Sequence, residues 1–245
     1  MSYALNLKRS PVDTRDWAFK PSRAVTVLPP VDLRSDRIPI LDQGSLGSCT
    51  ANAGVVLAEY VRNKKDTYYF NLSRAYLYYH SRKLQGWEGQ DSGAFIRDMV
   101  KVLATKGCCT ESRFPYDRTT FLNEPSVEAE ENAPDHLITE YRAVYSLSDM
   151  VASLLEGYPV VFGIDIHEHF LSSAMAENGI LPRIDTSTTF YGSHAMLSEG
   201  ATYINNELYV IARNSWGKQW GDKGYCYIHN SWFNGWNVFD MWTAR

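Results

Sequence analysis

Cys49 stands at the start of a helical pattern, a position at which a cysteine can become a nucleophile. Ala51, Val55 and Ala58 recur after it at helical spacing, and Ser48 is a candidate N-cap. Attack by a thiolate requires a lowered thiol pKa, and a helix N-terminus supplies partial positive charge and unpaired N–H groups. A buried cysteine that only fills space fits the same pattern. The helical pattern therefore leaves both roles open.

Three sequence blocks, in a fixed order, favour the catalytic role. The first reads Gln-Gly-Ser-Leu-Gly-Ser-Cys and runs from Gln43 to Cys49. The second reads Ser-His-Ala, with His194 in the middle. The third reads Asn-Ser-Trp-Gly-Lys-Gln-Trp-Gly-Asp-Lys-Gly-Tyr and begins at Asn214. Together they contain a thiol, an imidazole and two side-chain amides, the groups that acyl transfer through a thioester requires.

These blocks resemble the cysteine, histidine and asparagine motifs of papain-like cysteine proteases. His194 follows Cys49 by 145 residues and Asn214 follows it by 165, whereas the family spacing is about 130–150 residues. An eight-residue tip from Ala201 to Leu208, between two strands, is expected to account for the extra length. The resemblance extends from about residue 30 to the C-terminal region.

The resemblance implies peptide-bond hydrolysis through an acyl-enzyme, with no cofactor. Cys49 attacks the scissile carbonyl, His194 acts as acid and base, and Asn214 orients the imidazole. The side-chain amide of Gln43 and the backbone N–H of Cys49 are expected to form the oxyanion hole. Trp216 is expected to cover the histidine–asparagine hydrogen bond and to exclude water from it.

Five further residues are implied to contact the substrate, which is expected to be a protein or peptide. Ser92 and Gly93 resemble the glycine-containing segment that pairs with the substrate backbone. Gly163, Gly192 and Ala195 are expected to line a roomy, largely apolar pocket for the residue two before the scissile bond. These small side chains leave space for a substrate side chain.

Three positions depart from the family pattern and indicate a divergent member. Thr50 follows the nucleophile where tryptophan is usual, and Leu46 replaces a cysteine that is normally disulfide-bonded. Ser193 stands where many members have asparagine or aspartate. The usual disulfides are therefore not expected, and residues 1–30 are too short for the long helical prosegment of lysosomal relatives.

Helical patterns come first along the chain and strand patterns second, which predicts an α+β protein with two lobes. The papain-like catalytic domain is expected over residues 31–245, with a helical lobe over about 31–130 and a β-rich, barrel-like lobe over about 131–245. The active-site cleft is expected between them. Helices are predicted to begin near residues 49, 73, 93 and 148, and strands near residues 160, 194, 207 and 224. The charged stretch 123–135 is expected to connect the lobes.

Residues 1–30 form a separate N-terminal extension, because prolines recur in it and interrupt regular elements. Trp17 is its expected anchor. We interpret the extension as a structural arm or a short propeptide. Our hypothesis is that it wraps over the lobes and shields the cleft until it is cleaved or displaced.

The composition excludes several other classes of protein. A formal net charge of -4 gives no basic face for nucleic acid, and the apolar runs are too short to span a membrane. Four cysteines, two of them the adjacent Cys108 and Cys109, make no disulfide framework. The lack of a disulfide framework and of a visible signal peptide favours an intracellular, cytoplasmic location. His167 and His169 share one face of a strand end but lack further ligands, so no metal site is expected.

Two alternatives to peptide hydrolysis use the same resemblance. The thioester could pass its acyl group to an amine, which would make the protein an acyl transferase or ligase. A non-catalytic binding module on this fold would be expected to lack one of the four key groups. Because Gln43, Cys49, His194 and Asn214 are all present, the sequence favours an enzyme over a binding module.

Overall fold

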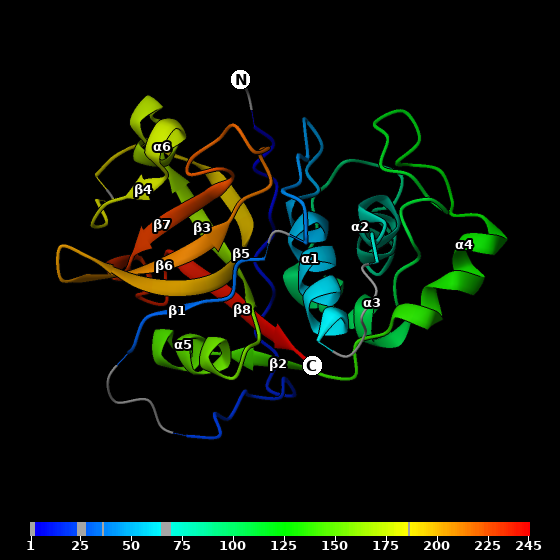
Figure 1. Ribbon diagram of the computed structural model, residues 1–245. Helices are drawn as coiled ribbons and strands as arrows, with labels where there is room; N and C mark the ends of the chain where they lie inside the picture. The colour runs from blue at the N-terminus through cyan, green and yellow to red at the C-terminus, as the bar shows by residue number, and fades with distance from the viewer. Residues whose placement is uncertain (1–2, 24–27, 36, 65–69, 186) are drawn as a thin grey trace.

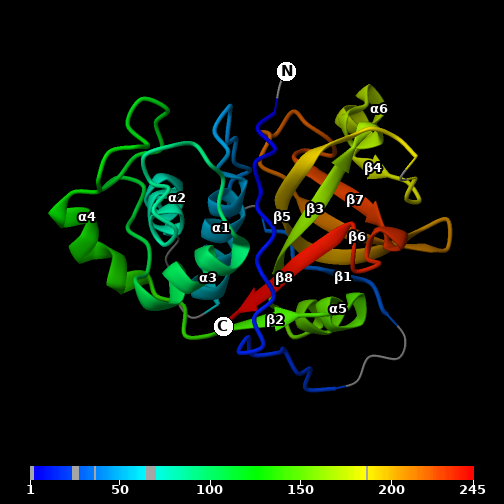
Figure 2. The same ribbon diagram turned by 180° about the vertical axis from the view of Figure 1, so that it is seen from behind.

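The computed structural model describes residues 3–23, 28–35, 37–64, 70–185 and 187–245. Figure 1 shows a helical lobe on one side and a β-rich lobe on the other. The chain that follows from residue 3 runs between the two lobes, as both views show (Figures 1 and 2). The structure therefore has the α+β, two-lobed architecture that the sequence predicts.

Three helices pack together in the helical lobe: α1 (Cys49–Asn63), α2 (Arg74–Lys83) and α3 (Ile96–Thr105). Helix α1 is central, because it packs against the other two helices and also against the sheet of the other lobe. This position agrees with its sequence, because apolar residues lie on more than one side of the helix and each of these sides needs a packing partner. The buried residues Val55 and Leu57 point in different directions around it.

The charged stretch 123–135 contains a helix that the sequence reading did not predict. Helix α4 (Val127–Asn132) is followed by the 3-10 helix η1 (Ala133–His136), and α4 lies at the outer end of the helical lobe (Figure 1). The hydroxyl of Ser126 accepts a hydrogen bond from the N–H of Ala129 and so caps α4. The crossing to the β-rich lobe comes after η1.

The β-rich lobe is built on one sheet, which in the described part of the chain has the strand order β2-β8-β3-β5-β6-β7-β4, with β1 paired to β5. Neighbouring strands are antiparallel, except for β4 and β7. The strands are β1 (Val31–Asp32), β2 (Tyr141–Val144), β3 (Val160–His167), β4 (Ile180–Leu181), β5 (Phe190–Ile204), β6 (Glu207–Arg213), β7 (Tyr225–His229) and β8 (Val238–Ala244).

The hairpin of β5 and β6 is tighter than the sequence suggested. The two strands remain paired as far as Ile204 and Glu207, and only Asn205 and Asn206 form the turn. Their φ angles are 51° and 65°, a combination that suits a two-residue hairpin and that asparagine tolerates. The expected eight-residue tip, 201–208, is therefore wrong, because most of those residues extend the strands.

Short helices complete the β-rich lobe. Helix α5 (Leu147–Leu155) packs against β1, β3 and β5, and it is followed by Gly157, whose φ of 81° ends the helix as predicted. The other short helices of this lobe are α6 (Ser173–Asn178), η2 (Glu168–Leu171) and η3 (Asn230–Trp232). None of the helices described is both long and apolar enough to cross a membrane.

Residues 3–23 form an extended arm that runs along the junction of the lobes (Figure 2). The N–H of Leu7 donates to the carbonyl oxygen of Ser193 on β5 at 3.2 Å. The N–H of the next residue, Lys8, donates to the carbonyl oxygen of Ala94, before α3, at 3.4 Å. The arm is thus hydrogen-bonded to both lobes.

The anchors of the arm differ from the one that the sequence suggested. The ring of Trp17 is 69% exposed and lies against the guanidinium of Arg142, so the aromatic side chain is not a buried anchor. Its backbone does hold the arm, because its carbonyl oxygen accepts the N–H of Ala143 on β2 at 2.9 Å. Phe19 is buried in the core of the β-rich lobe instead. Asp16, next to Trp17, forms an ion pair with Arg97 of α3 at 2.5 Å.

Candidate active site

Cys49 is the first residue of α1 and is fully buried. Burial raises the pKa of its thiol to about 11, although backbone N–H groups of Ala195, Thr50 and Cys49 itself act in the opposite direction. Ser48 occupies the N-cap position but makes no capping bond, because its hydroxyl contacts Tyr116 at 2.5 Å. The thiol therefore faces helix N–H groups, as predicted, within an environment that keeps it protonated.

His194 and Asn214 come together because β5 and β6 are adjacent antiparallel strands. The imidazole Nε2 lies 2.8 Å from Oδ1 of Asn214. That oxygen also accepts the N–H of Ser215 at 2.8 Å, which fixes the orientation of the amide. Because an amide oxygen can only accept, Nε2 must carry the proton of this bond. In the neutral imidazole the basic lone pair is therefore on Nδ1.

The second ring nitrogen of His194, Nδ1, is buried and finds no hydrogen-bond partner in the described part of the protein. The ring itself is fully buried, and this lowers the pKa of His194 to about 4, although the hydrogen bond to Asn214 opposes that shift. Trp216 lies over the imidazole, with ring centroids 4.9 Å apart. The tryptophan is therefore placed as the predicted cover of the histidine–asparagine pair requires.

Gln43 is fully buried between the start of α1 and the segment after β6. Its Oε1 accepts the hydroxyl of Ser215 at 2.6 Å, so the amide nitrogen is directed the other way. That nitrogen donates to the carbonyl oxygen of Leu46 at 2.9 Å and to that of Ala4 at 3.3 Å. The predicted oxyanion-hole donor thus faces a carbonyl group of the arm. Ser215 was missed by the sequence reading, although it lies inside the Asn-Ser-Trp motif.

A sequence profile described as papain family cysteine protease matches residues 29–240. The chain belongs to the papain family. This match covers both lobes and all four residues that were predicted to do chemistry.

Named relatives of this papain-family chain agree with the match. A peptidase C1-like protein of Acanthamoeba polyphaga mimivirus is 34% identical over 76% of the chain, and a cathepsin L-like proteinase of Fasciola hepatica is 27% identical over 76%. The chain spans 62% and 55% of the lengths of these two relatives. The crystal structure of xylellain, a cysteine protease from Xylella fastidiosa, superposes with a TM-score of 0.89 at 30% identity and covers 99% of this chain and 96% of xylellain.

In this papain-family chain, Asp91 fastens the turn before the nucleophile. Its carboxylate oxygens accept the N–H of Gly47 at 3.0 and 3.1 Å, and one of them accepts the hydroxyl of Tyr78 at 2.5 Å. The same hydroxyl accepts the N–H of Gly93 at 3.0 Å. The chain Gly47–Asp91–Tyr78–Gly93 therefore links the nucleophile turn to the segment expected to pair with substrate.

Asp91 acts on the turn before the nucleophile and does not cap the following helix, because the N-cap of α3 is Phe95. The turn also lacks the disulfide that is usual in the family, because Leu46 stands at the position of one of its two cysteines. Hydrogen bonds to a carboxylate are about twice as strong as neutral ones, so Asp91 supplies a firm non-covalent fastening at this place.

The arm fills the positions predicted for substrate. The side chain of Leu7 approaches Gly163 so closely that an added Cβ there would lie 2.8 Å from it. Gly163 pairs with Ala195 on one side and with Phe239 on the other. Leu7, Ala195 and Phe239 belong to one buried apolar cluster. An aliphatic side chain of the arm therefore packs at the place where the sequence predicts the apolar pocket.

Two more predicted substrate residues contact the arm. An added Cβ at Gly93 would lie 1.8 Å from the carbonyl oxygen of Asn6, and one at Gly192 would lie 2.8 Å from Leu5. Both glycines also have positive φ angles, of 73° and 143°, so both position and conformation favour glycine. The hydroxyl of Ser92 donates to the carbonyl oxygen of Gly93 at 2.9 Å.

At its beginning the arm covers the histidine side of the site. The ring of Tyr3 stacks on Trp216, with centroids 3.7 Å apart and planes 7° from parallel. Further along the arm, the carbonyl oxygen of Ala4 accepts a hydrogen bond from the side chain of Gln43. The side chain of Leu7 then lies against Gly163. The arm therefore crosses the whole site, from Trp216 to Gly163.

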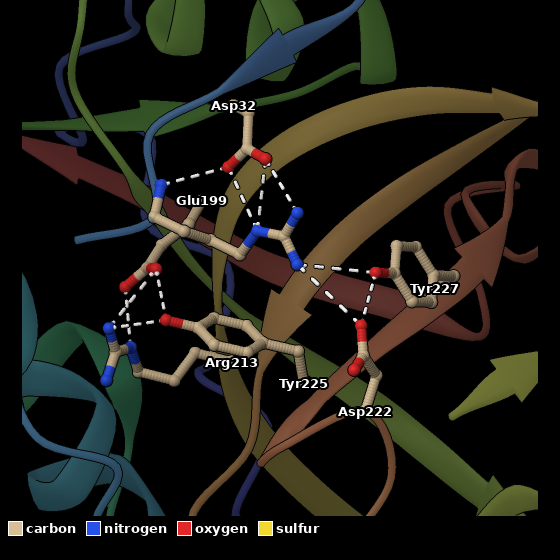
Figure 3. Close-up of polar contacts among 7 residues, drawn as sticks. Asp32, Glu199, Arg213, Asp222, Tyr225 and Tyr227 are labelled. Carbon is tan, nitrogen blue, oxygen red and sulfur yellow. Dashed lines mark hydrogen bonds and ion pairs between the residues drawn. The ribbon is translucent and has the colours of Figure 1, made fainter. Parts of the chain in front are cut away.

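A buried ion pair holds the strand end that carries Asn214. Arg213 pairs with Glu199 of β5 at 2.6 Å, and Tyr225 joins the pair (Figure 3). Burial raises the pKa of Glu199, and the adjacent guanidinium opposes that shift. Arg213 also donates to the carbonyl oxygen of Pro39 at 3.1 Å, in the segment that leads to the oxyanion-hole glutamine. One side chain thus positions two parts of the site.

A second group of contacts in Figure 3 lies beside the first and ties β1 to β7. Arg34 pairs with Asp32 at 2.7 Å and contacts the hydroxyl of Tyr227 at 3.3 Å. Asp222 accepts the hydroxyl of Tyr227 at 2.6 Å. These contacts fix the loop that follows Trp216, and the sequence reading missed them.

The remaining chemical side chains lie away from the cleft residues. His167 contacts the carbonyl oxygen of Thr188 at 3.2 Å, and His169 faces Asp185 at 3.7 Å. The described residues contain no group of three or more histidine, cysteine, aspartate or glutamate side chains that could hold a metal ion. The other free cysteines are buried, as expected for structural thiols: Cys108, Cys109 and Cys226.

Proposed function

We propose that this protein is a cysteine peptidase that hydrolyses peptide bonds of proteins or peptides through an acyl-enzyme on Cys49. The arrangement that carries the proposal is the hydrogen bond from His194 Nε2 to Asn214, which leaves Nδ1 as an unpartnered base. The thiol of Cys49 contacts the backbone N–H of Ala195, the residue after that histidine. The strand that carries the proposed base therefore also contacts the thiol, at the start of α1.

The chemistry follows from this placement. Nδ1 of His194 takes the thiol proton, and the thiolate of Cys49 attacks the carbonyl carbon. The resulting oxyanion accepts hydrogen bonds from the Gln43 amide and the Cys49 N–H, and losing one such donor costs about 10²–10³ in rate. The imidazolium then protonates the leaving amine. A water molecule, deprotonated by the same imidazole, releases the acid and restores the thiol.

The named relatives are called peptidases or proteinases, so hydrolysis is favoured over transfer of the acyl group to an amine. Asn214 is neutral, so it can orient the imidazole in both its neutral and its protonated state without adding a charge. The substrate class that we propose is correspondingly broad, namely peptides that present an aliphatic side chain to the Gly163 pocket, where Leu7 now lies.

We further propose that the arm keeps the site latent. Tyr3 covers Trp216, the carbonyl of Ala4 occupies Gln43, and Leu7 fills the pocket. In the covered site burial raises the pKa of Cys49 to about 11 and lowers that of His194 to about 4, so both groups are neutral between these values. Removing the arm admits water and favours the thiolate–imidazolium pair.

We also propose that the direction of the arm protects it from cleavage by this site. A leaving amine must lie near His194 and Trp216, so the acyl part of a substrate must extend toward Gly163. A substrate therefore runs from N- to C-terminus in the direction from Gly163 to Trp216. The arm runs the opposite way, from Tyr3 at Trp216 to Leu7 at Gly163. The peptide groups of the arm therefore face Cys49 in the opposite N- to C-terminal direction from those of a substrate.

The test is labelling of Cys49 with an epoxysuccinyl probe from pH 4 to 9, together with peptide cleavage, in the full chain and in its Leu7→Ala, His194→Ala and Cys49→Ala variants. We expect slow labelling in the full chain and faster labelling with cleavage in Leu7→Ala. Cleavage should be lost in His194→Ala and Cys49→Ala. Labelling only above pH 8, unchanged by His194→Ala, would contradict the peptidase. Equal rates in the full chain and Leu7→Ala would leave the arm a structural element.

A further inference from the structure

The arm reveals a second pocket beyond the one that Leu7 occupies. The guanidinium of Arg9 donates to Oδ2 of Asp165 at 2.5 Å and to the carbonyl oxygen of Trp236 at 2.8 Å. The same guanidinium lies over the ring of Phe239, 3.7 Å from its centroid. A carboxylate, a carbonyl oxygen and an aromatic face together are the groups that bind a guanidinium. Three separate parts of the β-rich lobe therefore converge on one cation.

We propose that, when the arm is displaced, Asp165, the Trp236 carbonyl and Phe239 form a substrate subsite for a basic side chain, with arginine preferred over lysine. This inference rests on the proposed peptidase function and assigns part of its substrate preference. The preference for arginine follows because a planar guanidinium can donate to the carboxylate and the carbonyl while stacking on the ring.

The carboxylate is held in place by the sheet and not by the arm. Asp165 lies on β3 opposite Ser193 of β5, whose hydroxyl donates to its other oxygen, Oδ1, at 2.7 Å. Its own N–H donates to the carbonyl oxygen of Asn237 at 2.9 Å. The side chain is 16% exposed with the arm in place. A carboxylate fixed in this way binds a cation at little cost in conformational entropy.

The loop that supplies the carbonyl is fixed as well. Oδ1 of Asn234 accepts the N–H groups of Trp236 and Asn237, both at 3.0 Å. Gly235, which lies between Asn234 and Trp236, has a φ of 83°, which this tight turn requires. The Trp236 carbonyl is therefore oriented by its own loop, and the subsite is preformed.

The position of this subsite relative to the scissile bond follows from β geometry. Gly163 and Asp165 are two apart on β3, so they share one face of the sheet about 7 Å apart. Leu7 and Arg9 are likewise two apart on the extended arm and contact these two residues in turn. A substrate running the other way has the same spacing. Its basic side chain is therefore two residues upstream of the one in the Gly163 pocket.

The predicted substrate class combines the two pockets. The residue in the Gly163 pocket is aliphatic, and by the family resemblance it is the second residue before the scissile bond. The basic residue is then the fourth before it. Phe239 forms a wall of both pockets, because its ring meets Leu7 at Gly163 and Arg9 beyond it.

The first test measures kcat/KM for peptides that differ only at the fourth position, with arginine, alanine or glutamate there. It uses the full chain with Leu7→Ala to loosen the arm. We expect arginine to exceed alanine about tenfold, as a partly exposed ion pair with a cation–π contact allows, and glutamate to be the poorest. Adding Asp165→Asn should abolish the arginine preference and leave the aliphatic preference of the neighbouring pocket unchanged. Asp185→Asn, an exposed carboxylate in the same lobe, is the matched control.

The second test does not depend on peptide cleavage. Iodoacetamide labelling of Cys49 reports exposure of the thiol in Arg9→Ala, Asp165→Asn and the double variant. If Arg9 and Asp165 act as a pair, each single change speeds labelling and the double variant adds little. Additive effects, or cleavage without an arginine preference, would overturn the subsite while leaving the peptidase intact. Labelling without cleavage of any peptide would instead contradict the peptidase and with it the substrate subsite, and the labelling cycle would then report only the contact between Arg9 and Asp165.

Discussion

The side-chain amide of Gln43 donates to the carbonyl oxygen of Ala4 at 3.3 Å. A donor that the proposed mechanism assigns to the oxyanion is thus in contact with a ground-state carbonyl of the same chain. In the proposed mechanism no bond is cut there, because the arm runs against the direction proposed for a substrate. The same proposal makes the oxyanion-hole donor one of the groups that hold the arm.

The stack of Tyr3 on Trp216 should contribute to latency. Tyr3→Ala removes it, and aromatic pairs are worth about 0.5–1.5 kcal/mol beyond burial, so Cys49 should be labelled several-fold faster. Val12→Ala is the control, since Val12 belongs to the arm but is 96% exposed. The measurement is the rate constant of labelling at fixed pH. An unchanged rate in Tyr3→Ala would mean that the stack does not hold the arm.

Acid should weaken the covered state. Burial lowers the pKa of His194 from 6.5 to about 4, so the stability linked to its neutral form is present above pH 6.5 and is lost as pH falls toward 4. A shift of this size corresponds to at most about 3 kcal/mol. Urea unfolding at pH 4, 5 and 6.5 should show a steeper acid loss in the wild type than in His194→Gln. His80, which also has a lowered pKa, is common to both proteins and cancels. Parallel curves would contradict the prediction.

The Asp91 fastening should affect catalysis more than stability. Tyr78→Phe removes the hydroxyl that bridges Asp91 and Gly93, and Asp91→Asn weakens the bonds to Gly47. We expect kcat to fall about tenfold in an arm-loosened protein, since a misplaced nucleophile costs rate. Tyr76→Phe is the control, because it removes a hydroxyl bond to Glu130 from the same helix. Equal losses in Tyr76→Phe would mean a general effect of the helix.

The buried ion pair should be needed for stability and for the placement of Asn214. Glu199→Gln leaves Arg213 buried without its anion, which should cost about 3–5 kcal/mol. Glu140→Gln removes a surface partner of Arg142 and should cost less than about 1 kcal/mol. Chemical denaturation measures both values. A cost for Glu199→Gln similar to that of the surface variant would show that Arg213 finds other partners.

The central parts of the site could be predicted because local patterns specify them. The apolar helical pattern after Cys49 places it at a helix start, and the strand patterns place His194 on β5 and Asn214 directly after the neighbouring strand β6. The family motifs then supply their partners. Papain-family membership, the two-lobed fold and the protease assignment are supported by the comparisons.

The course of the arm could not be predicted, because it depends on a surface formed by distant residues. Residues 3–9 show no helical or strand pattern of their own. Their partners lie more than 30 residues away along the sequence. Trp17 was misjudged for the same reason, since the burial of one aromatic side chain depends on where the arm lies. The role of Asp91 depends on Gly47, 44 residues earlier. The strands β1 and β4 have two residues each, too few to show a period.

The arm is covalently part of the protein that it covers, and this sets the strength of its hold. A tethered segment acts at an effective concentration of about millimolar, whatever the amount of protein in solution. On the proposed latency, dilution does not activate the protein, and a competing peptide must bind well enough to overcome that concentration. Activation then requires a cut between the arm and the rest of the chain, or a partner that captures the arm.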